Sequence, residues 1–93
     1  MADVKVQTAD EGDPYRFVVT IQEGGSQTQH QVTLRQADYE RLSGGKSTAQ
    51  GLVEESFRFL LEHESKESIL RTFDLTVIGR YFSSYEREIR GRL

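Results

Sequence analysis

The sequence predicts an α+β fold in which a three-stranded antiparallel meander is followed by three to four helices. Apolar and polar residues alternate with a period of two from residue 4 to residue 34, which is typical of strands that bury one face. Beyond residue 36 the apolar residues recur at helical spacing. Because the helices follow the strands without alternating with them, the two kinds of element are expected to segregate. The 93 residues fit a single domain, 1–93.

The first two strands are predicted on either side of a turn. Val4, Val6 and Thr8 alternate with polar residues and indicate the first strand. Residues 10–14 read Asp-Glu-Gly-Asp-Pro, a combination that is typical of turns. The alternation resumes over residues 15–22, which predict the second strand.

A hairpin connects the second strand to the third. Residues 23–26 contain two adjacent glycines, which adopt the positive φ values of a tight hairpin turn at no steric cost. The third strand, residues 28–34, carries His30, Val32 and Leu34 on its apolar face. Its other face is polar.

Capping patterns predict the first two helices. Thr33 and Gln36 form a capping box that precedes a short helix over residues 37–42, with Gly44 beyond its end. Ser47 and Gln50 form a second capping box. It is expected to open a longer helix that ends near residue 64.

The longer helix has an unusually wide apolar arc. The arc covers about 200°, roughly twice what a surface helix needs. We therefore expect packing on two sides, one against the sheet and the other under later helices or a partner subunit. The arc consists of Leu52, Val53, Phe57, Phe59, Leu60 and Leu61.

The last third is predicted to be helical. Ser65 is expected to cap a short helix that carries Ile69, Leu70 and Phe73. Asp74 is expected to cap the next one. A third capping box, Ser83 with Glu86, leaves open whether the chain breaks at residues 83–84.

Composition excludes several classes of protein. The sequence has no Cys, which removes disulfides, thiolate nucleophiles and thiolate metal sites. It has no signal-peptide core and no apolar run near the ~18 residues that span a bilayer, so we expect a cytoplasmic protein without membrane contact. The net charge of −3 argues against a non-specific nucleic-acid binder.

No motif in the sequence predicts catalysis or a cofactor. Gly45-Lys46-Ser47 matches the end of a P-loop, but position 40, where the pattern needs Gly, is Glu. We interpret it as a helix–helix connection. His63 lies between two glutamates at a helix end, and His30 is expected to be a hydrogen-bonded, partly buried imidazole. We expect neither an enzyme, nor a metal, nor a cofactor.

The favoured function is therefore a non-enzymatic interaction module that binds a protein partner or a second copy of itself. Aromatic and Arg side chains are enriched at binding hot spots. The alternative interpretation is that the aromatic residues only hold the last helix to the core. The candidate docking residues are Phe59, Arg80, Tyr81, Phe82, Tyr85 and Arg87.

Residues 29–64, with Val32-Thr33-Leu34 followed by two helices, resemble ribbon–helix–helix repressors and antitoxins. The resemblance implies a DNA-binding regulator whose strand enters the major groove. It would assign base contacts to Gln29, Gln31 and Thr33, and a phosphate contact to Lys46 and Ser47.

Two further readings complete the alternatives. The run from Glu67-Ser68-Ile69-Leu70 to Glu86 resembles the ends of small uncharacterised bacterial proteins and implies no function. A small enzyme with an unrecognised site is the remaining alternative.

Overall fold

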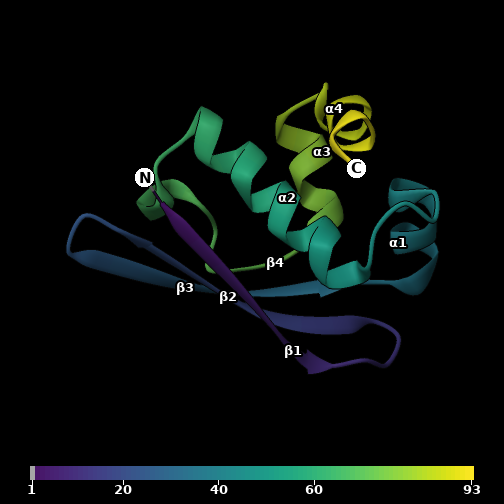
Figure 1. The fold of residues 1–93 in the computed structure, drawn as a ribbon, viewed down its shortest axis with the longest axis horizontal. Helices are drawn as coiled ribbons and strands as arrows, with labels where there is room; N and C mark the ends of the chain where they lie inside the picture. The colour runs from purple at the N-terminus through teal and green to yellow at the C-terminus, as the bar shows by residue number, and fades with distance from the viewer. Residues whose placement is uncertain (1) are drawn as a thin grey trace.

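The sheet has four strands, one more than the sequence predicted. A computed structural model describes residues 2–93. The strands lie in the order β1-β2-β3-β4, and the helices cover one face of the sheet (Figure 1). The three-stranded antiparallel meander is confirmed, and the fourth strand runs parallel to the third. The bounds are β1 Asp3–Asp10, β2 Tyr15–Glu23, β3 Ser26–Leu34 and β4 Thr72–Asp74.

The hairpin between β2 and β3 forms at the predicted glycines. Gly24 and Gly25 have φ values of 62° and 141°, and the turn between Glu23 and Ser26 contains only these two residues. Burial along each strand then alternates, so that one face of the meander meets the helices and the other carries mostly polar side chains.

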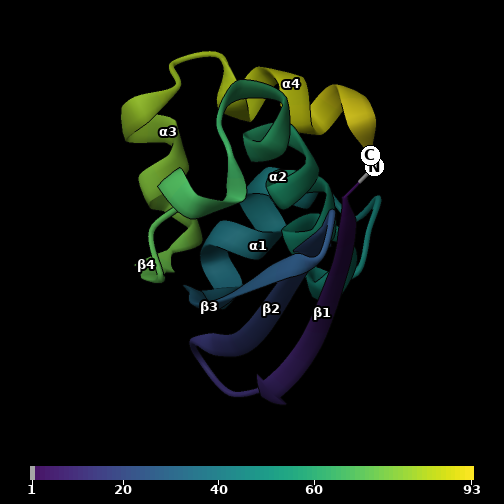
Figure 2. The same cartoon turned by 90° about the vertical axis from the view of Figure 1, so that its left-hand side faces the viewer.

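The helical layer of the described chain contains one long helix of 15 residues, two helices of 8 residues, one of 4 residues and two single 3₁₀ turns. Figure 2 shows α4 packed across the side of α2 that faces away from the sheet. The bounds are α1 Gln36–Ser43, α2 Ala49–His63, η1 Lys66–Ser68, η2 Leu75–Val77, α3 Ile78–Tyr81 and α4 Tyr85–Arg92.

Two helix starts differ from the predicted capping boxes. The N-cap of α1 is Arg35, and its side chain makes no cap hydrogen bond. Asp13, from the β1–β2 turn, instead accepts a hydrogen bond from the Gln36 amide over 3.1 Å. At α2 the cap is Thr48, one residue after the predicted Ser47, and it accepts from the Gly51 amide over 3.0 Å. The predicted left-handed residue after α1, Gly44, is confirmed with φ 57°.

The predicted helix over Ile69–Phe73 is wrong. The chain there is extended, and Thr72–Asp74 forms β4 beside Gln31–Thr33. The Gln31 amide donates to the Arg71 carbonyl over 2.7 Å, and the Thr33 hydroxyl donates to Asp74 over 2.8 Å. β3 therefore supplies the hydrogen-bond partners that a helix would have supplied within itself.

The chain does break near residues 83–84. α3 ends at Tyr81 and α4 begins at Tyr85. The predicted cap at Asp74 is confirmed, because its carboxylate accepts from the Thr76 amide over 3.1 Å, although it opens a 3₁₀ turn rather than an α-helix.

The wide apolar arc of α2 is covered within the chain. Val53, Phe57 and Phe59 have no exposed surface. One side of α2 packs on β1, and the other packs under α3 and α4, where the Phe59 ring lies 5.6 Å from Phe82 and 5.4 Å from Tyr85. The later helices, rather than a partner subunit, therefore cover the second side.

Candidate docking site

An apolar groove lies where the end of α2, the extended segment before β4, and α3 meet. It has a volume of about 230 Å³. Leu60, Phe73 and Ile78 are buried lining residues, and Glu64 also lines the groove. The exposed fractions of Leu70 and Tyr81, which line it as well, are 48% and 70%. These two are the exposed large hydrophobic residues of the described chain, so its uncovered apolar surface is concentrated at one place.

His30 fixes the wall of the groove that carries Leu70. Its ring is fully buried, with Nδ1 2.8 Å from the Leu70 carbonyl oxygen and Nε2 2.8 Å from the Thr28 hydroxyl. A carbonyl oxygen only accepts, so Nδ1 carries the proton and Nε2 accepts from Thr28. Burial lowers the pKa of His30, which keeps the ring neutral. Nδ1 thus holds the main chain at Leu70, while the bond from Thr28 to Nε2 fixes the orientation of the ring on β3.

An aromatic cluster supports the α3 side of the groove. The His63 ring lies 4.6 Å from Phe59 and 5.0 Å from Phe82, and Phe82 itself lines the groove. Below them the Tyr85 hydroxyl lies 2.7 Å from the Ser56 hydroxyl. Burial raises the pKa of the Tyr85 phenol.

The structure separates the six predicted docking residues into three groups. Tyr81 and Phe82 line the groove. Phe59 and Tyr85 are fully buried, so they support Phe82 from below and offer no surface to a partner. Arg80 and Arg87 are exposed, and neither forms an ion pair with another described residue.

The sequence interpretation missed Leu70 and Arg71. The sequence pattern predicts Leu70 on a short helix, and that helix does not form. Arg71 is exposed and, like Arg80, has no ion pair among residues 2–93. Leu70 is therefore followed in the sequence by the unpaired Arg71, and Tyr81 is preceded by the unpaired Arg80. The only sequence signal for this site was that two adjacent apolar residues, Ile69 and Leu70, follow a run of charged residues.

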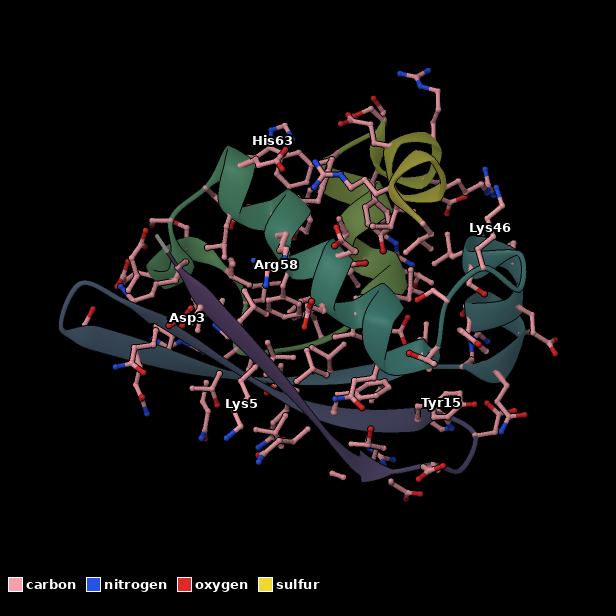
Figure 3. The ribbon with its side chains drawn as sticks, in the orientation of Figure 1. Asp3, Lys5, Tyr15, Lys46, Arg58 and His63 are labelled. Atoms are coloured by element: carbon pink, nitrogen blue, oxygen red, sulfur yellow. The ribbon has the colours of Figure 1, made fainter. Side chains whose placement is uncertain are left out.

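The residues assigned to DNA by the ribbon–helix–helix resemblance do not share a surface. Gln29 and Gln31 are exposed on the sheet face opposite the helices, whereas Lys46 lies on the helical side (Figure 3). Thr33 is half-buried and bonded to Asp74. β4 occupies the edge of β3 over Gln31–Thr33, where a two-fold mate would have to pair.

The two histidines pack against different aromatic rings, His30 against Phe57 and His63 against Phe59 and Phe82. Within residues 2–93 no group of three His, Asp or Glu side chains could hold a metal ion. None of the described helices combines the length and the apolar character needed to cross a membrane. Comparison with known protein families, curated proteins and solved structures gave no match.

Proposed function

We propose that this protein is a non-enzymatic interaction module that binds a short apolar segment of another protein in the groove between α2, β4 and α3. The observation that carries the proposal is the exposure of Leu70 and Tyr81 at this one groove. Exposed apolar surface costs solubility, and contiguous patches of it mark interaction sites. Tyr is also enriched among the residues that dominate binding energy.

The size of the groove favours a side chain over a cofactor. Its volume of about 230 Å³ is below the roughly 300–1,000 Å³ of small-molecule pockets. The lining is almost entirely apolar, with Glu64 as its charged member. One large apolar side chain of a partner would fill it and remove Leu70 and Tyr81 from water.

The charges beside the groove favour an acidic flank on the partner. Arg71 adjoins Leu70, and Arg80 adjoins Tyr81, and both are exposed without ion pairs in the described chain. A carboxylate next to the apolar anchor would pair with either guanidinium. The partner segment we infer therefore carries a large apolar residue beside Asp or Glu.

A selection from a library of random dodecapeptides tests the proposal. We expect enriched peptides to contain a large apolar residue beside an acidic one, and fluorescence anisotropy to give their affinity. Leu70→Ser and Tyr81→Ala should each weaken binding at least tenfold, and Arg80→Glu should weaken it further for the acidic peptides. Val18→Ser and Arg16→Glu, on the opposite face of the sheet, are the matched controls.

Two results would contradict the proposal. One is a selection without enrichment, and the other is binding that Leu70→Ser and Tyr81→Ala leave unchanged. A titration with random duplex DNA at low salt tests the second candidate function, that of a DNA-binding regulator. Salt-dependent binding that Lys46→Ala or Gln31→Ala abolishes would favour a DNA-binding regulator instead.

A further inference from the structure

β1 is a free edge of the sheet. The strand order places β1 beside β2 only, and Figure 2 shows no strand beyond it. β1 runs from Asp3 to Asp10 without a proline, and its pairing with β2 is regular as far as Thr8. A regular strand with an unpaired edge is a template for a further strand, and proteins usually protect such edges.

The hairpin register shows which groups of β1 face outward. A two-residue turn closes on a hydrogen-bonded pair, here Glu23 and Ser26, and bonded pairs then alternate along the ladder. Even-numbered residues of β2 therefore bond to β1, through odd-numbered residues such as Lys5, which pairs with Thr20. The amide and carbonyl of Val4 and of Val6 consequently point away from the sheet.

The Val4 end of the β1 edge is more accessible to a further strand than the Thr8 end. Thr8 borders a pocket together with Thr48 and Ala49, at the start of α2. In the same region Gln50 donates to the outward carbonyl of Val6 over 2.7 Å. A strand added at the Thr8 end would meet these residues, so the accessible part of the edge is centred on Val4.

The exposed side chains around Val4 carry charges that are complementary to those of the same strand in a second copy. Asp3 and Lys5 lie on the polar face of the sheet, where Figure 3 labels both, and neither forms an ion pair with another described residue. If two copies pair antiparallel with Val4 opposite Val4, Asp3 of each copy lies opposite Lys5 of the other. A register centred on Lys5 would instead oppose two lysines, which is destabilising.

We propose that the chain forms a two-fold dimer by antiparallel pairing of β1 with β1 of a second copy, centred on Val4. The outward groups of Val4, the Val6 amide and the Ala2 carbonyl then form about four main-chain hydrogen bonds, while the Val6 carbonyl keeps its bond to Gln50. An Asp3–Lys5 pair lies at each end. Pairing along one short strand gives an interface at the lower end of specific sizes, so the dimer is expected to depend on concentration. The groove lies on a different part of the fold and does not take part.

Sedimentation equilibrium over micromolar to millimolar concentrations tests the dimer. Lys5→Asp places Asp opposite Asp, and Asp3→Lys places Lys opposite Lys, so each variant alone should dimerise at least tenfold more weakly. An equimolar mixture of the two restores both opposite-charge pairs and should dimerise as the unmodified chain does. Lys46→Asp makes the same charge change away from the edge and should have no effect, and circular dichroism checks that each variant is folded.

Hydrogen exchange of the Val4 and Val6 amides gives a second readout, because these amides should become protected as the dimer forms. The proposal is overturned by a monomer throughout the concentration range. It is also overturned by a dimer that neither charge reversal weakens, or by one that forms without protecting these amides. None of these outcomes depends on whether the groove binds a peptide.

Discussion

Gln50, in the first turn of α2, donates a hydrogen bond from Nε2 to the main-chain oxygen of Val6 over 2.7 Å. The sequence pattern had assigned Gln50 to a capping box with Ser47. The side chain instead crosses to the free edge of β1 and satisfies a carbonyl that has no strand partner. This bond ties the start of α2 to the sheet.

We expect Gln50→Ala to lower the free energy of unfolding by about 0.5–1.5 kcal/mol, the usual net value of one hydrogen bond. Urea unfolding followed by circular dichroism measures the change. Gln7→Ala, at an exposed position of β1, is the control and should change stability less. Equal losses in the two variants would mean that the bond to Val6 contributes nothing.

Truncating the buried side chains of α2 should lower the free energy of unfolding more than removing the Gln50 bond does. Phe57 is fully buried and Leu60 is 4% exposed. Phe57→Ala should cost about 3–5 kcal/mol and Leu60→Ala about 2–5 kcal/mol, because each leaves a cavity. Tyr81→Ala, at an exposed aromatic residue, should cost much less in the same urea experiment. A loss below about 1 kcal/mol at both core positions would show that this face of α2 is not packed as described.

His30 predicts a loss of stability in mild acid. Its pKa is lowered in the folded chain below the ordinary 6.5, chiefly by burial, so the unfolded chain takes up the proton first. Stability is therefore complete above pH 6.5 and decreases as the pH falls from 6.5 toward the lowered pKa. The exposed Glu62 and Glu67, whose pKa values are lowered by Arg92 and Lys66, lose their contributions only below about pH 4.5.

The urea midpoint measured between pH 5.5 and 7.5 checks this dependence. His30→Gln should remove most of the slope, although it lowers stability at every pH. His63→Gln, which makes the same replacement at the other histidine of the sequence, is the matched control. A slope that survives in His30→Gln would assign the pH dependence to another group.

The buried hydroxyl pair of Ser56 and Tyr85 predicts strong coupling. Ser56 donates to the Leu52 carbonyl over 2.8 Å, so the Tyr85 hydroxyl donates to Ser56. Ser56→Ala leaves the Tyr85 hydroxyl buried without a partner and should cost about 1–3 kcal/mol. In a double-mutant cycle, Ser56→Ala should cost less once Tyr85→Phe has removed that hydroxyl. Strictly additive losses would rule out the coupling.

The sequence determined the elements whose cause is local. The alternation from Val4 to Leu34 and the glycines at 24 and 25 were sufficient for the meander, because period-two burial and positive φ are properties of short segments. The left-handed Gly44 and the Asp74 cap were predicted for the same reason. The breadth of the apolar arc on α2 also indicated correctly that the helix is covered on two sides.

Tertiary structure decided everything that depends on a distant partner. Residues 69–74 contain apolar residues at a spacing that suits a helix, but the unpaired edge of β3 binds their main chain, so β4 forms and Leu70 turns outward. The burial of Phe59 and Tyr85 depends on where α4 packs, and the exposure of Tyr81 depends on the break after α3. Local preferences differ by about 1 kcal/mol or less per residue, whereas a strand ladder and a packed core each contribute several such terms. For that reason the groove, and with it the candidate docking site, exists only in the folded chain.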